Sequence, residues 1–339
     1  ESFKKLGEAE IVMDKIHEKA FFYETTHDHL TYIFVGHDSY FSKSKYYGYE
    51  NDAIRFTFFN FAILEYVKLT KNNQNIIHAN DWQTSLTPFF LDVFYRPQSQ
   101  SFRDIKTLLS IHNLEKQGAY AIETEKLFNH KNFTYIHMNQ VNFLKSGIMR
   151  ANAINTVSEN YKDEILTRFY GFSLEGPLMS RKNDLYGILN GFDDELYNPK
   201  NNEHIYQTYD ENTYMIGKKI NKKALIKDLK LKADLDIPIV SFIHRFARQK
   251  GIDIMMEVLD EYLSDQKFYF IAIGSGDAIY ESYFMKLKQK YPDLVYYNEG
   301  FNVELEQKVY AASDLFMLPS LFEPCGLNHM IAMKYGALP

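Results

Sequence analysis

This sequence contains a single cysteine and no long apolar run, and each of these two features excludes a class of protein. Cys325 is the only cysteine, so an internal disulfide cannot form and a reducing compartment is favoured. No stretch reaches the roughly 18 apolar residues that a transmembrane helix needs. Residues 1–5 contain neither an initiator Met nor an apolar signal segment, so we interpret them as an internal start that would hide any targeting signal.

An excess of positive charge is also absent. The formal net charge of −6 argues against a basic surface for nucleic acid. A few well-placed Arg and Lys side chains would still suffice to bind phosphate locally. Aromatic residues are abundant, at 16% of the chain. Their faces can stack on sugars, but most of them are expected to fill the core.

The length of 339 residues is too great for one ordinary core and fits two domains. Short apolar runs alternate with amphipathic stretches, which is typical of parallel β/α units. The expected strands are Leu30–Val35, Asn75–Ala79, Lys106–Ile111, Ala153–Val157, Leu185–Leu189, Ile239–Ile243, Phe268–Ile273, Leu294–Tyr297 and Leu315–Leu318. The expected helices are Asp52–Leu69, Leu86–Tyr95, Phe133–Met149, Asn160–Phe169, Ile252–Leu263, Ala278–Tyr291, Val303–Ala312 and Gly326–Tyr335.

A polar breaker run at 198–202 and a Lys-rich helix at 218–232 separate the two halves. We place the boundary between residues 194 and 195, which gives domains 1–194 and 195–339. The predicted fold class is α/β, with two Rossmann-like domains that face a cleft.

Polar residues gather where the predicted strands end. In open α/β sheets, ligands bind beyond the carboxyl ends of the strands, so these residues are expected to line one site. They are His112-Asn113, Arg245, Gly274-Ser275-Gly276-Asp277 and the segment from Ser320 to Gly326.

Arg245 and Lys250 stand five positions apart, between a strand end and the start of the helix at Ile252. Both cations can face one anion there, with help from the helix N-terminal amides. Arg offers a fork to two phosphate oxygens and Lys a point charge, which suits a diphosphate leaving group. Two solvated cations at a loop are the plainer alternative.

The segment Ser320–Leu327 carries one carboxylate, Glu323, after an apolar strand and before a helix. The glycine at 326 lets the backbone approach a ligand closely. A carboxylate at this place can hold sugar hydroxyls or face a developing oxocarbenium ion. For an isolated Glu323, a helix-opening acid that interacts with the helix dipole would be the favoured interpretation, but the whole eight-residue string favours a ligand role.

The remaining motifs are weaker. Gly274–Asp277 predicts either a phosphate or ribose contact or a tight turn with Asp277 as N-cap. His112 stands at a strand end, where a half-buried structural histidine is the alternative. Trp82, beside Asp81, either shapes a sugar subsite or fills the core, and we favour support of the cleft wall. No HExxH, cysteine pair or His/Asp cluster predicts a metal, and no GxSxG predicts a hydrolase.

At these residues the chain resembles the bacterial glycogen synthase and plant starch synthase family, which has the GT-B architecture. The matching strings follow the family order across nearly the whole chain. They are HANDWQT (78–84), IHNLEKQG (111–118), NTVSENY (155–161), YGFSLEG (170–176), GILNGFDDELYNP (187–199), HRFARQKG (244–251), GSGD (274–277) and LPSLFEPCGLNHMIAMKYGALP (318–339).

The resemblance implies a role for individual positions. Arg245 and Lys250 would bind the donor diphosphate and stabilise the departing nucleoside diphosphate. Glu323 would contact the transferred glucose, and His112 would line the sugar pocket from the N-terminal, acceptor-side domain. Phe301, after Gly300, would stack on the nucleotide base. The other implied substrate-binding residues are Asp81, Trp82, Asn190, Gln249, Ser320, Cys325, Gly326 and Leu327.

The reaction that the resemblance implies is retaining transfer of glucose to the nonreducing 4-OH of an α-1,4-glucan, in which the leaving phosphate helps to deprotonate the acceptor. ADP-glucose is the expected donor, UDP-glucose stays open, and no cofactor or metal is expected. The expected partners are the nucleotide-sugar donor and the α-1,4-glucan acceptor, and no nucleic acid or membrane partner is expected. Whether the protein forms a homo-oligomer stays open. The expected compartment is the bacterial cytoplasm, with a plastid not excluded.

The sequence also departs from the family pattern. The N-terminal K-x-G-G-L loop and the TGG segment after GALP lie outside it, so both domains are expected to be incomplete and the activity of this chain alone stays open. Leu321 stands where the family more commonly has Arg, and Asn328 stands where it has Thr or Gln. His244 stands where the family usually has Ser. Two alternatives therefore stay open: another retaining nucleotide-sugar glycosyltransferase, and a noncatalytic glucan-binding paralogue.

Overall fold

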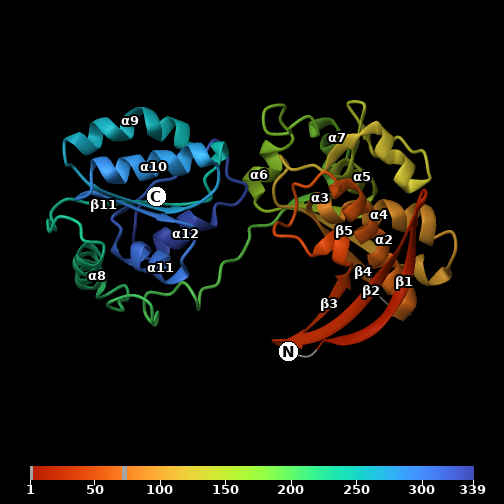
Figure 1. Cartoon of the computed structure of the whole chain (residues 1–339), viewed down its shortest axis with the longest axis horizontal. Coiled ribbons are helices and arrows are strands. Elements are labelled where there is room, and N and C mark those ends of the chain that lie inside the picture. The colour runs from red at the N-terminus through yellow and green to blue at the C-terminus, as the bar shows by residue number, and fades with distance from the viewer. Residues whose placement is uncertain (1–2, 71–74) are drawn as a thin grey trace. The chain divides into compact units, whose positions relative to one another are not determined.

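A computed structural model describes residues 3–70 and 75–339 of the chain. The chain divides into two compact units, Glu1–Leu189 and Asn190–Pro339 (Figure 1). The boundary expected from the sequence, between 194 and 195, falls a few residues beyond this division.

The second unit is built on a four-stranded parallel sheet with the order β13-β12-β11-β14. Its strands are β11 (Ile239–Ile243), β12 (Tyr269–Gly274), β13 (Val295–Glu299) and β14 (Leu315–Phe316). Its helices are α8 (Tyr214–Asp228), α9 (Ile252–Ser264), α10 (Ala278–Lys290), α11 (Val303–Ala312) and α12 (Leu327–Lys334), with a short 3-10 turn at Arg248–Lys250. Helices α9 and α10 cover one face of the sheet, and α11 and α12 cover the other (Figure 1).

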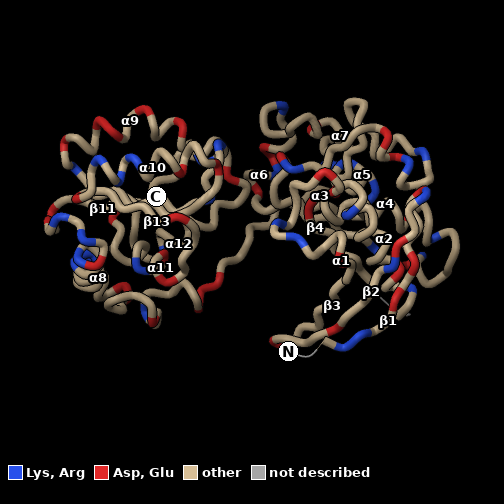
Figure 2. Tube along the Cα trace, viewed as in Figure 1, with Lys and Arg blue, Asp and Glu red and all other residues tan. Residues whose placement is uncertain are grey.

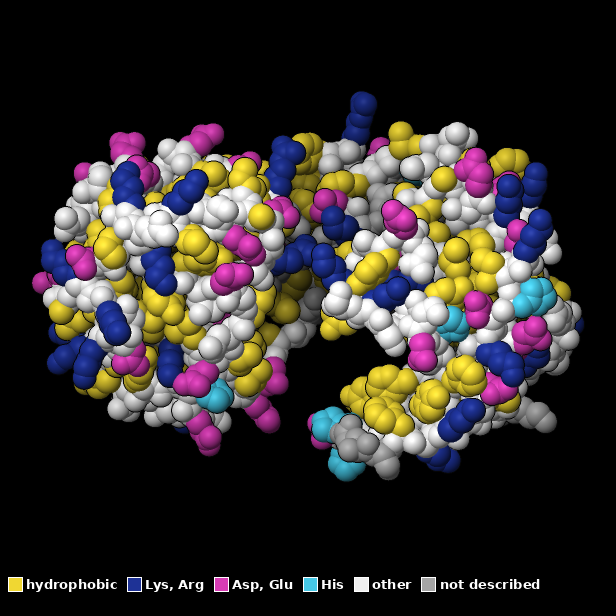
Figure 3. All heavy atoms as spheres, in the orientation of Figure 1, with side chains coloured by type: hydrophobic (Ala, Val, Ile, Leu, Met, Phe, Trp, Pro, Cys, Tyr) yellow, Lys and Arg dark blue, Asp and Glu magenta, His cyan; other side chains and the backbone are white. Residues whose placement is uncertain are grey.

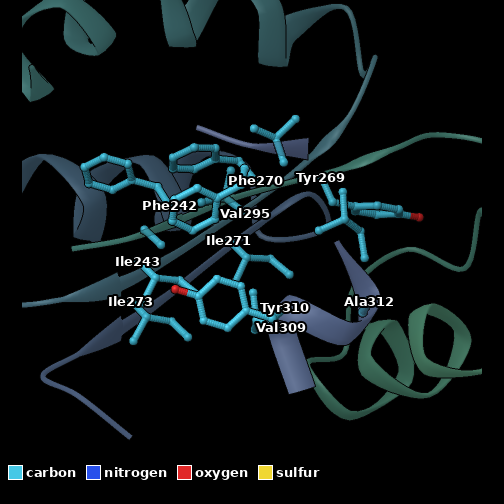
Figure 4. Close-up of a cluster of buried hydrophobic side chains, with 14 of the residues drawn as sticks. Phe242, Ile243, Tyr269, Phe270, Ile271, Ile273, Val295, Val309, Tyr310 and Ala312 are labelled. Carbon is cyan, nitrogen blue, oxygen red and sulfur yellow. The ribbon is translucent and has the colours of Figure 1, made fainter. Parts of the chain in front are cut away.

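Covered faces explain the uninterrupted apolar strands of this unit. All five residues of β11 and all six of β12 are buried, as expected for parallel strands between two helical layers. Figure 4 shows side chains of the core around them, with Phe242, Phe270 and Tyr310 among the residues labelled. The sequence therefore predicted this half well, because a fully buried strand needs a continuous apolar run.

The first unit contains a second parallel sheet, with the order β10-β9-β5-β4. Its strands are β4 (Ile76–Asn80), β5 (Lys106–Ile111), β9 (Ala153–Thr156) and β10 (Leu185–Gly187). The helices of the unit are α1 (Asp38–Phe41), α2 (Asp52–Thr70), α3 (Asp81–Thr84), α4 (Leu86–Phe90), α5 (Phe143–Arg150), α6 (Glu159–Glu164) and α7 (Glu175–Ser180), with a π turn at Leu91–Tyr95 and 3-10 turns at Gln100–Phe102, Ile122–Phe128 and Lys182–Asp184.

An antiparallel sheet opens the chain, and the sequence did not predict it. Strands β1 (Lys4–Met13), β2 (Ile16–His27) and β3 (Leu30–Gly36) pair in order, so the predicted strand at Leu30–Val35 lies in an antiparallel sheet. The hairpin between β2 and β3 turns at Asp28 and His29, which both have positive φ, as a two-residue type I′ turn requires. The expectation of a parallel β/α unit was wrong for this strand.

Two predicted helices are shorter than expected. The helix predicted at Phe133–Met149 is only α5, because the residues before it form β7 (Ile136–His137) and β8 (Gln140–Asn142), which join β6 (Ala119–Ala121) in a small sheet. The side chain of Asn142 accepts a bond from the Lys145 N–H and so starts α5 there. The helix predicted at Asn160–Phe169 ends at Glu164, where turns follow.

None of the helices in residues 3–70 and 75–339 combines the length and apolar character that a membrane crossing demands.

Candidate functional site

The strand order of the second unit marks one place where the chain reverses its direction across the sheet. From β11 the sequence runs outward through β12 and β13, then returns so that β14 pairs with the other side of β11. In doubly wound sheets, ligands bind at this reversal, beyond the carboxyl ends of the two strands. The two strongest sequence motifs, 244–251 and 318–327, directly follow these two strands.

Lys250 and Glu323 meet at this place. The Lys250 Nζ lies 2.5 Å from the Glu323 Oε1, and both side chains are more than four-fifths buried. The Ser320 hydroxyl donates to the same oxygen over 2.7 Å. Across the described residues, no side chain is bonded to the Glu323 Oε2, which leaves that oxygen for a hydroxyl of a ligand.

The two loops are joined by further bonds that fix this pair. The Leu321 N–H donates to the Gln249 carbonyl over 2.9 Å, and the Gln249 amide donates to the Phe322 carbonyl over 3.1 Å. Gly251 has φ +68°, and a Cβ on it would lie 2.0 Å from the Pro319 oxygen. Only glycine therefore allows this close approach.

Arg245 stands at the end of β11 with an exposed side chain, and within the described part of the chain no carboxylate lies at ion-pair distance from it. It is available to an anionic ligand. Its neighbour His244 is buried, and burial, assisted by the charge of Lys250, lowers the pKa of its imidazole to about 3. His244 is therefore neutral near pH 7 and adds no charge to the site.

The glycine-rich turn after β12 is bonded to the same loop. The Phe246 N–H donates to the Ser275 carbonyl, and the Asp277 N–H donates to the Phe246 carbonyl, both over 2.8 Å. Asp277 stands at the N-cap position of α10, yet its side chain makes no capping bond. Phe301, after Gly300 at the end of β13, is 58% exposed, so its ring is free to stack on a ligand.

Residues at the start of α12 complete this edge of the second unit. Burial raises the pKa of the Cys325 thiol, and a hydrogen bond from the Asn190 backbone partly opposes this, so Asn190 lies beside Cys325. Asn328 donates to the Ile243 carbonyl over 2.6 Å and ties α12 to β11. Gly326 begins α12 with φ +75°, and Leu327 is its first residue.

Replacing Gly326 by Ala is expected to lower the free energy of unfolding by ~1–2 kcal/mol, because a Cβ disfavours the left-handed conformation. The new Cβ would also lie 2.5 Å from the His329 Nδ1. Urea unfolding of the two proteins measures the loss. Gly326→Asn, which tolerates positive φ better, should lose less, and equal losses in the two variants would contradict this account.

In the first unit, Asp81 and His112 lie together at the ends of β4 and β5. The Asp81 Oδ1 accepts the His112 N–H over 2.8 Å, and the His112 imidazole Nε2 lies 3.0 Å from the Asn80 Oδ1. Asp81 has φ +53°, an uncommon conformation for a residue other than glycine. Burial raises the pKa of its carboxyl, and the hydrogen bond and electrostatic interaction with His112 oppose this increase only in part. The His112 side chain is exposed and can contact a ligand.

Trp82 is only 5% exposed, so its ring is packed in the unit and offers no open face to a sugar. The ring of Phe56 packs edge-on against it at 4.7 Å between centroids, and a Cβ on Gly118 would lie 2.4 Å from its Cε3. Tyr47, whose ring centroid is 6.0 Å away, is 37% exposed above it. Tyr47 is a candidate sugar-binding residue that the sequence analysis did not identify. Its position in a cluster with Tyr46 and Tyr49 could have indicated it.

A buried ion pair holds this tyrosine-bearing loop. Arg55 and Asp52, in the first turn of α2, bond to each other and are 2% and 4% exposed. The Arg55 Nε donates to the Tyr40 carbonyl over 2.6 Å, and the Asp52 Oδ2 accepts the N–H groups of Gly48 and Tyr49 over 2.6 and 3.1 Å. The pair thus fixes both ends of residues 40–49.

Glu306, on α11, is an unexpected acid in the second unit. Burial raises the pKa of its carboxyl to about 7. Burial, with a smaller contribution from the charge of Glu306, raises the pKa values of Tyr197 and Tyr310. Since its pKa is raised on folding, its contribution to stability is complete below about pH 4.5 and is lost as the pH rises through 7.

We therefore expect Glu306→Gln to be more stable than the wild type by roughly 2 kcal/mol at pH 8 and by almost nothing at pH 4.5. Chemical denaturation across this pH range measures the difference. An advantage that does not grow between pH 5 and pH 8 would show that the carboxyl is not shielded from water as the structure has it.

Within the described residues, no group of three or more His, Cys, Asp or Glu side chains is arranged to hold a metal ion. The prediction that the reaction requires no metal and no cofactor stays a prediction.

Comparison with known families agrees with the division into two units. The sequence model of the family described as "Starch synthase catalytic domain" matches residues 1–180. The model described as "Glycosyl transferases group 1" matches residues 226–339. The class of protein is therefore a glycosyltransferase.

Curated relatives with the name glycogen synthase cover nearly the whole chain. The protein from Acholeplasma laidlawii is 45% identical over 336 residues, which are 98% of this chain and 69% of that protein. The one from Bacillus licheniformis is 39% identical over 327 residues, with 92% and 66% covered. The chain thus spans about two thirds of the length of these relatives.

A solved structure extends the agreement to the fold. The catalytic domain of starch synthase IV from Arabidopsis thaliana, bound to ADP and acarbose, superposes with a TM-score of 0.89 at 29% identity over 99% of this chain and 71% of that one. Sucrose-phosphate synthase from Thermosynechococcus elongatus, at 20% identity and a TM-score of 0.54, shares the fold alone. The chain belongs to the glycogen and starch synthase family, and the GT-B fold predicted from the sequence is confirmed.

Proposed function

We propose that the protein containing this chain transfers glucose, with retention, from a nucleoside diphosphate glucose to the nonreducing 4-OH of an α-1,4-glucan. The observation that carries the proposal is the buried pair of Lys250 and Glu323 at the strand-order reversal of the second unit. It combines a cation for a diphosphate with a carboxylate for a sugar. The names of the relatives, and the ADP bound to the starch synthase, support the same reaction.

The donor diphosphate is proposed to lie between Arg245 and the start of α9. Lys250 carries three N–H donors, of which Glu323 and a phosphate oxygen can each accept one. As the bond to the transferred glucose breaks, negative charge grows on the leaving phosphate, and both cations stabilise it more strongly than in the ground state. Phe301 would stack on the base, and ADP-glucose is the donor we propose.

Glu323 is proposed to act on the transferred glucose. Its Oε1 is held by Lys250 and Ser320, so Oε2 can accept a sugar hydroxyl and face the positive charge that develops at the anomeric carbon. We assign no covalent nucleophile. The departing phosphate would take the proton of the acceptor hydroxyl, which needs no additional base on the protein.

The acceptor glucan is proposed to bind the first unit. His112 would contact the sugar at the site of transfer, and Tyr47, supported from below by Trp82, offers an exposed ring for a glucose face. The remaining positions implied by the family resemblance, Asn190, Gln249, Gly300, Cys325, Gly326 and Leu327, are proposed to line the donor site.

The test is a transfer assay with ADP-glucose and UDP-glucose, each with and without glycogen. Glycogen-dependent release of ADP, with glucose incorporated into the polymer, is expected. Release of nucleoside diphosphate only with a small acceptor such as fructose 6-phosphate would support a different transferase on the same fold. Glucan binding without nucleotide binding in calorimetry would support a noncatalytic paralogue.

A further inference from the structure

Helix α8 carries the densest group of cations in the chain, and the glycosyl-transfer site uses none of them. Seven lysines stand between residues 218 and 232, in a chain whose net charge is −6. Figure 2 shows Lys and Arg gathered on this helix. Asp228 is the only acidic residue of α8, and its carboxylate accepts a hydrogen bond from the Tyr206 hydroxyl over 2.7 Å.

Two of these lysines point inward and serve the fold. Lys218 donates to the carbonyls of Ala311 and Tyr335 over 3.3 and 2.9 Å, where α11 and α12 end. Lys222 forms an ion pair with Asp314 over 3.0 Å. These contacts account for the position of both lysines on the packed side of the helix.

Three other lysines, at positions 219, 223 and 227, point outward and are exposed. They follow one another at intervals of four, so they lie along one side of the helix. In the described parts of the chain, no carboxylate lies at ion-pair distance from any of the three. Folding therefore gives no reason for this row of positive charge.

Exposed apolar side chains lie beside the row. Ile216 and Ile220, four positions apart, are 69% and 42% exposed, and Met215 and Tyr214 are 71% and 46% exposed in the first turn. We define the α8 face as Tyr214, Met215, Ile216, Lys219, Ile220, Lys223 and Lys227. The space-filling view in Figure 3 shows a convex surface where α8 lies, with dark blue and yellow side chains interspersed.

We propose that the α8 face binds the surface of an anionic lipid bilayer. Apolar side chains between lysines suit the boundary between lipid tails and acidic headgroups, because each kind of side chain meets its own layer. A deformable bilayer fits a convex face, whereas recognition of a peptide helix uses a groove. Attachment would be peripheral, which departs from the expectation of no membrane partner, because that expectation rested on the absence of an apolar run long enough to span a bilayer.

Vesicle sedimentation tests the proposal. The protein is expected to bind vesicles of phosphatidylcholine with about 30% phosphatidylglycerol at least ~10 times more strongly than pure phosphatidylcholine vesicles. Raising the salt concentration should weaken this binding, because it screens the lysines. Lys219→Glu/Lys223→Glu/Lys227→Glu should lose at least ~10-fold in partition, and Ile216→Ser/Ile220→Ser should also bind more weakly.

Lys286→Glu on α10 is the matched control, because Lys286 is also exposed and follows the exposed Met285. It should bind vesicles as the wild type does, and all variants should keep the melting temperature and the transfer rate. Equal binding to neutral vesicles, or wild-type binding by the triple variant, would overturn the proposal. Retention on immobilised polyglutamate without vesicle binding would assign the face to an acidic protein and would also overturn it.

Discussion

Replacing either Glu323 or Lys250 by Ala is expected to lower kcat for glucose transfer at least about a hundredfold. Lys250 loses its charge where the departing diphosphate becomes more negative, and Glu323 loses the carboxylate that faces the anomeric carbon. The loss should appear in kcat more than in the KM for the glucan, because both groups act most strongly on the transition state. Initial rates of glycogen-dependent ADP release measure it.

The matched control is Lys290→Ala, which breaks an exposed pair with Asp260 at 2.7 Å in the same unit. An exposed pair contributes little, so this variant should keep its rate and stability. Melting curves of the Glu323 and Lys250 variants separate lost chemistry from lost folding. Rates within about twofold of the wild type for both of these variants would refute the assignment of the site.

Replacing Asp52 by Ala is expected to cost ~3–5 kcal/mol of stability, because it leaves the Arg55 guanidinium buried without its partner. The N–H groups of Gly48 and Tyr49 would also lose their acceptor. Since residues 40–49 carry Tyr47 over Trp82, the KM for the glucan should rise in the variant while the Kd for ADP stays unchanged. Urea unfolding and saturation kinetics measure the two effects.

Lys68→Ala is the control for this second change, because it removes an exposed pair with Glu65 from the other end of α2. It should change the free energy of unfolding by less than ~1 kcal/mol. A comparably small loss for Asp52→Ala would mean that Arg55 reaches water in the variant, and the loop would then not depend on the pair. An unchanged KM would remove Tyr47 from the acceptor site.

The sequence was most informative where burial is complete. Strand β11 and helix α11 have the predicted bounds, because a strand buried on both faces and an amphipathic helix each leave a regular pattern. Strands β1 and β2, which pair with each other across a two-residue turn, escaped prediction because segments such as Lys4–Met13 are rich in Lys and Glu, which are depleted in strands. The helix predicted from Phe133 failed for a different reason, because pairing among the short strands β6, β7 and β8 overrode its local pattern.

The site divides in the same way. That Lys250 and Glu323 lie close together could be predicted, because each lies in a distinctive string after a strand and the strand order brings the strings together. The burial of Glu306 and of the Asp52–Arg55 pair could not be predicted, because acids and Arg in the first turn of a helix are usually surface residues. Only the packed structure shows that they are shielded from water.

A crystal structure of the protein with ADP and maltotriose tests the central claim most directly. The account predicts the β-phosphate within hydrogen-bond distance of Lys250 and Arg245, the adenine against Phe301, and the glucan in contact with His112. ADP bound elsewhere on the molecule, or a glucan that touches neither His112 nor Tyr47 while ADP is in place, would contradict it.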